Sequence, residues 1–251
     1  MRNKLILFSS ILMLLFSCKN NQQITVEEIL DLTPHQEENL DSVETEFNNK
    51  VNWKIVNEIN QSEWIAGQLN NNEKLIIDSL HLFSKNLLPK LYAHKQNNLL
   101  WTSEKNIEDA YRALELAWLD GLQPEDYHLS KLKSIQKKIL KSTSKEEKSV
   151  WISRHDIILT DAIVLYSFHL LTGKIDPVEL DNNWNYDNRT ISRETLLQLF
   201  QFLKDEKILE GLDQLRPSNP SYRAMMNAML FYHNYKDNEW AEINGFEKLE
   251  V

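Results

Sequence analysis

The stretch from residue 152 to residue 177, ISRHDIILTDAIVLYSFHLLTGKIDP, constrains the fold most, because it predicts a helix with almost no polar surface. At helical spacing its apolar side chains cover nearly the whole circumference. Ser153, Asp156, Thr160 and Ser167 fall in one narrow polar stripe. Gly173 suits a left-handed C-cap and Pro177 prevents continuation, so the helix should end at about Thr172. Such a helix has to be surrounded by other parts of the chain.

The composition is that of one globular domain, or at most two small ones, with 42% of the 251 residues hydrophobic and 26% charged. The net charge of -9 argues against a nucleic-acid partner, because a phosphate backbone attracts clustered Lys and Arg. Five Gly are too few for a Gly-rich nucleotide loop or a hairpin-dense β fold. A single Cys excludes an intrachain disulfide.

The N-terminus has the pattern of an export signal. Arg2 and Lys4 precede an apolar run at 5–16, and Leu-Phe-Ser-Cys closes it at Cys18. This order is similar to a bacterial lipoprotein signal, which implies cleavage of residues 1–17 and lipidation of Cys18. The alternatives are an ordinary signal peptide with an incidental Cys, or a short membrane anchor, although the run is too short to span a ~30 Å hydrocarbon core. Lys19 in place of Asp favours the outer membrane facing the periplasm, by resemblance to enterobacterial sorting.

The mature chain divides into two segments of different composition. Residues 18–50 are rich in Asn, Gln and acids, which predicts a disordered tether behind the lipidated Cys. Residues 51–251 show helical periodicity, so we predict an all-α, irregular multi-helix scaffold domain around the central buried helix. The expected helices are one between the Asn cap at 70–72 and Pro89, one from Asn106 to Asp120-Gly121, one from Pro124 whose outer face is the Lys-rich run to Lys148, two at 196–203 and 208–212, and one from Asn219-Pro220. Met225, Met226 and Met229 on the last helix could mark an adaptable binding surface, but we prefer to place them in the core.

No arrangement of residues indicates catalysis, a cofactor or a metal. His155 and His169 share a helix face, but about 21 Å of helix separates them, which is too far for one metal ion. Asp120, Asp126 and His128 flank one turn and could form an acid–base group. We prefer to interpret them as a C-cap, a first-turn acid and an exposed His, which explains all three. The sequence therefore predicts no catalytic, cofactor-binding or metal-binding residue.

Five segments together resemble a known family. They are LPKLYAHKQNNLLWTS at 88–103, DGLQPEDYH at 120–128, DIILTDAIVLYSFHLLTGKIDP at 156–177, Trp184, and LRPSNPSYRAMMNAMLFYHNY at 215–235. Their order and spacing are similar to the N-terminal scaffold region of the large YcbB-like murein L,D-transpeptidases. In that family the scaffold supports a peptidoglycan-binding domain and a catalytic domain, which crosslinks diaminopimelate residues of neighbouring stem peptides through a Cys in a His-Gly-Cys motif.

This chain has no His-Gly-Cys motif, and its only Cys is Cys18. The resemblance therefore implies no catalytic residue, and we expect the chain to be inactive alone. One interpretation is the scaffold region of a transpeptidase, cut off before the catalytic domain. The other is a free-standing envelope lipoprotein that binds peptidoglycan or a separate cell-wall enzyme. In both, the implied partners are the membrane, through the lipid, and peptidoglycan or a catalytic domain in cis or in trans.

Overall fold

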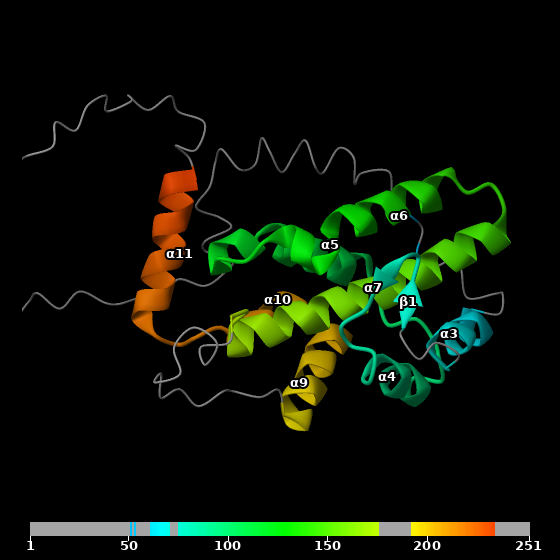
Figure 1. Ribbon diagram of the computed structural model, residues 1–251, viewed down its shortest axis with the longest axis horizontal. Helices are drawn as coiled ribbons and strands as arrows, with labels where there is room; N and C mark the ends of the chain where they lie inside the picture. Colours follow the sequence, from blue (N-terminus) through cyan, green and yellow to red (C-terminus); the bar gives the residue numbers. More distant parts are fainter. Residues whose placement is uncertain (1–50, 52, 54–60, 71–74, 176–191, 234–251) are drawn as a thin grey trace, which may run out of the picture.

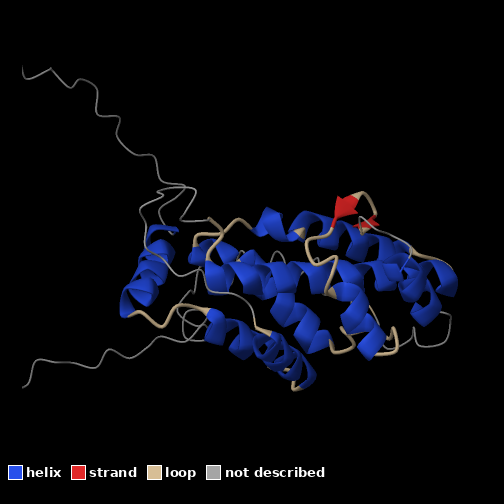
Figure 2. Cartoon of the chain, turned by 60° about the horizontal axis from the view of Figure 1, so that its bottom comes forward, coloured by secondary structure: helices blue, strands red, loops and turns tan. Residues whose placement is uncertain are grey.

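The computed structural model describes residues 51, 53, 61–70, 75–175 and 192–233. Within them the chain forms eight α-helices, two 3-10 helices and two short strands, which confirms the all-α prediction (Figures 1 and 2). In chain order these are α3 (Gln61–Asn70), β1 (Ile76–Ile77), β2 (Leu80–His81), α4 (Leu88–His94), α5 (Glu104–Glu115), η2 (Ala117–Asp120), η3 (Pro124–Tyr127), α6 (Leu129–Lys141), α7 (Lys145–Thr172), α9 (Arg193–Lys204), α10 (Ile208–Leu215) and α11 (Pro220–His233).

The central helix is α7, which runs along the long axis of the molecule (Figure 1). Its 28 residues make it roughly 42 Å long, and α3, α4, α5, α6 and α10 all pack against it. The polar stripe predicted on this helix is buried. Three of its hydroxyls, those of Ser153, Thr160 and Ser167, donate to backbone carbonyls one turn earlier, so burial leaves them satisfied.

Both ends of α7 differ in detail from the prediction. The helix begins at Lys145, where the Ser144 side chain accepts a hydrogen bond from the backbone N–H of Glu147. The Lys-rich run is therefore split between the end of α6 and the first turn of α7. Gly173 does cap the C-terminus with a positive φ of 84°, but its ψ of 158° is outside the left-handed helical region.

The helix predicted between residues 70–72 and Pro89 is wrong. The chain forms a hairpin there, in which Ile77 pairs with Leu80 around a two-residue turn with positive φ at Asp78 and Ser79. Positive φ at both turn residues matches the twist of adjacent strands, and Asp tolerates it. Pro89 does not end a helix but lies in the first turn of α4.

The helices on either side of Gly121 also begin and end differently. Ser103, not Asn106, is the N-cap of α5, and the Asn106 side chain donates to the Leu203 carbonyl instead. The stop at Gly121 is confirmed by its left-handed backbone, which follows η2. Pro124 opens the 3-10 helix η3, and α6 starts only after His128, whose φ is 60°.

α11 lies at one end of the molecule and is steeply inclined to α7 (Figure 1). Asn219 caps it as predicted, because the Asn219 side chain accepts the Ser221 N–H. Met226 and Leu230 form a small second core with Leu116 and Leu119 of the α5–η2 region. The core prediction is wrong for the other two Met residues, since Met225 is 68% exposed and Met229 is 40% exposed.

Among the described helices, none is both long enough and apolar enough to span a membrane. Trp184, Cys18 and the predicted boundaries at residues 17 and 50 lie outside the described residues.

Candidate functional site

A buried ion pair joins two parts of the chain 96 residues apart. The Arg216 guanidinium donates to both carboxylate oxygens of Asp120, from Nε at 2.7 Å and from Nη2 at 2.8 Å. The Arg216 side chain is 5% exposed, and that of Asp120 is not exposed at all. Local structure positions both groups: Asp120 ends η2 just before the left-handed Gly121, and Arg216 is the C-cap of α10. These two parallel hydrogen bonds fix the orientation of the guanidinium relative to the carboxylate, as well as the distance between them.

Two tyrosines complete the environment of Asp120. Tyr166 of α7 donates to one carboxylate oxygen at 2.6 Å, and Tyr222 of α11 donates to the other at 2.7 Å. Burial raises the pKa of Tyr166 well above its ordinary value, so its hydroxyl keeps the proton that it donates. Four donors thus occupy the acceptor positions of one carboxylate. We call Asp120, Tyr166, Arg216 and Tyr222 the Asp120 centre.

The Asp120 centre connects η2, α7, the end of α10 and the start of α11. A second acid, Asp213, extends it by accepting from Arg216 at 3.3 Å and from Arg223 at 2.7 Å. Every charged group of the centre is already paired within the chain, and the carboxylate is closed to solvent. The arrangement is therefore suited to holding α11 in place and not to transferring a proton.

The structure separates the three residues considered as an acid–base group. Asp120 is a buried acceptor, so its interpretation as a simple C-cap is wrong. Asp126 pairs with Lys174 on the surface, as a first-turn acid can. His128 is not freely exposed, since its Nε2 lies 3.3 Å from the buried Asp161 carboxylate. That carboxylate also accepts the backbone N–H groups of Phe83 and Ser84 and so anchors the segment after the hairpin.

His155 and His169 contact different tyrosines, as their separation requires. The Nε2 atom of His155 lies 2.8 Å from the Tyr111 hydroxyl, and the Nδ1 atom of His169 lies 2.9 Å from the Tyr127 hydroxyl. No group of three potential metal ligands occurs in the described ranges.

Asp156 forms a second buried network with the segment between α4 and α5. Its carboxylate accepts hydrogen bonds from the Tyr92 hydroxyl and from the backbone N–H groups of Leu100 and Trp101. Burial raises the pKa of Asp156 to about 6, against the opposing effect of these hydrogen bonds. The network ties a segment of the resemblance, residues 88–103, onto the central helix.

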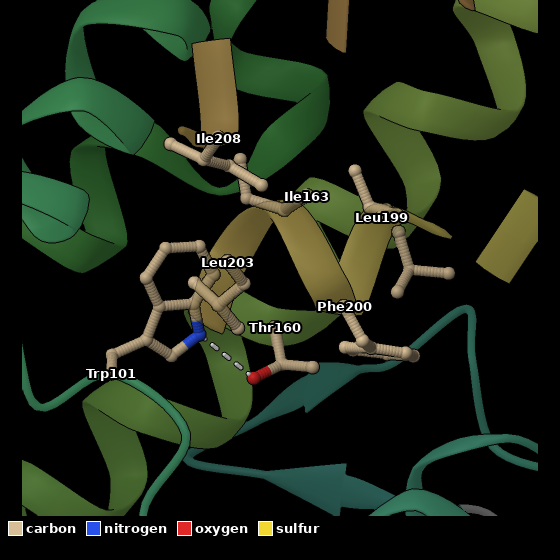
Figure 3. Close-up of a pocket in the computed structure, with 8 residues that line it drawn as sticks. Trp101, Thr160, Ile163, Leu199, Phe200, Leu203 and Ile208 are labelled. Carbon is tan, nitrogen blue, oxygen red and sulfur yellow. Dashed lines mark hydrogen bonds between the residues drawn. The ribbon is translucent and has the colours of Figure 1, made fainter. Parts of the chain in front are cut away.

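A shallow hollow lies between α7, α9 and α10. Figure 3 shows Trp101 and Thr160 at one side of it, joined by a hydrogen bond of 3.0 Å, with Leu199, Phe200 and Ile208 around the rest. The enclosed space is about 10 Å³, enough for one water molecule at most. This hollow cannot accept an organic substrate.

The comparison with known families decides what kind of domain this is. The model of the family described as Scaffold domain matches residues 86–229, which is more than half of the chain. The chain belongs to the Scaffold domain family. This agrees with the resemblance to the scaffold region of L,D-transpeptidases. Among the curated proteins and the solved structures, the comparisons found no match.

All four residues of the Asp120 centre lie in the part of the chain that matches the Scaffold domain. They also come from three segments that carried the resemblance, those at 120–128, 156–177 and 215–235. Sequence reasoning missed Arg216 and Asp161 as buried charged residues. The signal for Arg216 was its place between the apolar Leu215 and Pro217, next to a helix end.

Because His155 is buried, we predict that it lowers the stability of the protein as the pH falls. Burial lowers the pKa of His155 to about 3, whereas an unfolded His has a pKa of about 6.5. The unfolded state therefore binds the proton more tightly, and this His costs about 1.4 kcal/mol per pH unit as the pH falls from 6.5 towards 3. Asp156 has the opposite sign, because its raised pKa favours the protonated native state between about pH 4 and 6.

We expect His155→Gln to remove the loss of stability that His155 causes at low pH and to leave the gain in stability that Asp156 causes. Relative to the wild type, the variant should become more stable by about 1.4 kcal/mol for each pH unit below 6. Urea unfolding at pH 7, 6, 5 and 4 measures this difference. The exposed His94, changed to Gln, is the control. Parallel stability curves for the wild type and His155→Gln would show that His155 is not held neutral by burial.

Proposed function

We propose that this chain is the non-catalytic scaffold region of an L,D-transpeptidase-like system that crosslinks peptidoglycan. Membership of the Scaffold domain family supports the scaffold role. The resemblance to transpeptidases supports the cell-wall role. A lipid on Cys18 would attach the domain to the outer membrane, facing the periplasm, with the 18–50 segment as a tether.

The observation that carries the proposal is the exposed face of α11. Met225, Met229 and Tyr232 are spaced to form one stripe along the helix, and they are 68%, 40% and 67% exposed. Ala224 and Ala228 lie beside this stripe, and no charged residue interrupts it. Met and aromatic side chains are enriched in the cores of protein interfaces, from which charged residues are depleted. We call Met225, Met229 and Tyr232 the α11 stripe.

The side of α11 next to this stripe is fixed to the domain at both ends. Tyr222 donates to Asp120 near the start of the helix, and His233 stacks on Trp118 at its end, with ring centres 4.2 Å apart. These two contacts fix the rotation of α11 and so present the stripe at a defined angle. This is what a scaffold needs in order to hold a catalytic unit, whether that unit is in the same polypeptide or in a separate one.

A site-specific photocrosslinker tests this contact. We expect benzoylphenylalanine at position 225 or 229, introduced in the native host, to form a covalent adduct with a protein segment that carries a His-Gly-Cys transpeptidase domain. Position 197 is the matched control, because Leu197 is also an exposed apolar residue, 55% exposed, but lies on α9. Equal yields at 225 and 197, or adducts that contain no transpeptidase sequence, would contradict the proposal.

The alternative is a free-standing lipoprotein that binds peptidoglycan itself. The observation in its favour is a basic group, Lys138 and Arg154, whose charges both lie against the ring of Trp151. The two functions are compatible, because the basic group and the α11 stripe are on different elements.

A further inference from the structure

Two basic side chains near the start of α7 are held by aromatic rings. The Lys138 ammonium lies 4.1 Å from the centre of the Trp151 ring, and the Arg154 guanidinium lies 4.5 Å from the same centre. Arg154 also lies 5.8 Å from the centre of the Trp64 ring. These contacts bring α6, α7 and α3 together, and all four side chains remain partly exposed. We call Lys138, Arg154, Trp64 and Trp151 the cation–tryptophan cluster.

The two cations of this cluster are held by rings, whereas four lysines elsewhere in the domain are held by carboxylates. Lys105, Lys133, Lys174 and Lys207 each form an ion pair with a carboxylate. In the described part of the chain no carboxylate pairs with Lys138 or Arg154. The rings hold the cations by cation–π attraction, which leaves N–H donors available to an incoming anion.

The nearby acid is already engaged. Asp78, in the hairpin turn, pairs with Lys131 at 2.7 Å. Its hydrogen bond to Lys131 lowers the pKa of Asp78 against the effect of burial, and the charges of Lys131, Lys138 and Arg154 lower it further. Three positive charges therefore act on one carboxylate here. This local excess is opposite in sign to the chain, whose net charge is -9.

We propose that the cation–tryptophan cluster binds the carboxylates of peptidoglycan stem peptides. Charge complementarity favours an acidic ligand, and the partly exposed Trp64 and Trp151 offer apolar contact to the rest of the peptide or its sugar. This inference rests on the proposed cell-wall function and adds a ligand to it.

The position of the cluster fits a scaffold with two separate contacts. The α6–α7 connection lies at the opposite end of the long axis from α11 (Figure 1). A stem peptide bound at the cluster and a catalytic unit bound to the α11 stripe would then be held at opposite ends of the central helix α7. Binding at the cluster can therefore be tested without changing α11.

Calorimetric titration of the full chain with a purified disaccharide tetrapeptide tests the inference. We expect binding that Lys138→Gln with Arg154→Gln weakens by at least about tenfold, because both cations then lose their charge-assisted hydrogen bonds to the ligand carboxylates. Lys105→Gln with Lys207→Gln removes the same charge elsewhere and should leave the affinity unchanged. Lys138→Arg with Arg154→Lys keeps both charges and should retain binding.

Asp78→Asn is a change that should strengthen binding, an effect that damage to the fold would not produce. It removes a negative charge that lies within the field of Lys138 and Arg154, so the affinity for the tetrapeptide should rise. Two further probes identify the ligand chemistry: the same muropeptide with amidated carboxyl groups, and phosphatidylglycerol vesicles, neither of which should bind as well as the acidic muropeptide.

Equal affinity for the amidated muropeptide, or preference for the vesicles, would overturn the inference. So would absence of tetrapeptide binding to the wild type. In each of these cases the photocrosslinking result at α11 would be unaffected, so failure of this site is distinguishable from failure of the proposed function.

Discussion

Replacing Arg216 with Ala should lower the free energy of unfolding by about 3–5 kcal/mol, because it leaves the Asp120 carboxylate buried without its cation. The hydroxyls of Tyr166 and Tyr222 still donate to the carboxylate, but they carry no charge to compensate it. The loss should be largest around the α10–α11 connection, which the ion pair fixes. Urea unfolding at pH 7 gives the total effect, and amide hydrogen exchange shows where it is concentrated.

Two variants show whether burial of the pair is the cause. Lys207→Ala removes a cation from the exposed Lys207–Glu210 pair and should cost less than about 1 kcal/mol. Replacing Asp120 and Arg216 together with Leu should recover part of the loss, because no unpaired charge is then buried. A loss for Arg216→Ala as small as that for Lys207→Ala would mean that the Asp120 centre does not hold α11.

The central helix was predictable because it is apolar on nearly all sides. That pattern has one solution, which is burial among other helices, and the predicted end near Thr172 is confirmed. The start was missed because its first turns are charged and exposed, so they carry no apolar signal. A local signal was present, however: Ser144 followed by Glu147 is the spacing of a capping box.

The hairpin at Ile76–His81 was not predictable from periodicity. Its apolar residues also fit helical spacing, and the segment after it is anchored by Asp161, which lies 78 and 77 residues beyond the two groups it binds, the backbone N–H groups of Phe83 and Ser84. The Asp120–Arg216 pair likewise joins residues that are far apart in the sequence. Periodicity shows which face of a helix is buried, but it does not show which buried charges meet.

The partial exposure of the Met residues on α11 has a similar origin. Met225 and Met226 are neighbours with the same hydropathy, yet only Met226 faces the domain. A helix that is apolar on two sides does not reveal from sequence which side the domain covers. The Asp120 centre fixes the rotation of α11 and so decides which of these sides the domain leaves uncovered.

Placing charges on the α11 stripe should greatly reduce the crosslinks that the proposed system makes. Met225→Glu with Met229→Glu would bury two carboxylates in the contact with the catalytic unit, which should weaken that contact by more than about tenfold. Both side chains are exposed in the isolated domain, so its stability should change little. Leu197→Glu on α9 is the control for an added surface charge.

The measurement is the muropeptide composition of native-host cells in which the variant replaces the wild-type gene, read by mass spectrometry. We expect a severalfold loss of crosslinks between diaminopimelate residues in the double α11 variant, with the wild-type amount in Leu197→Glu and equal protein levels in both. Wild-type crosslinking in a folded, normally abundant double variant would contradict the proposal that this domain holds an L,D-transpeptidase through α11.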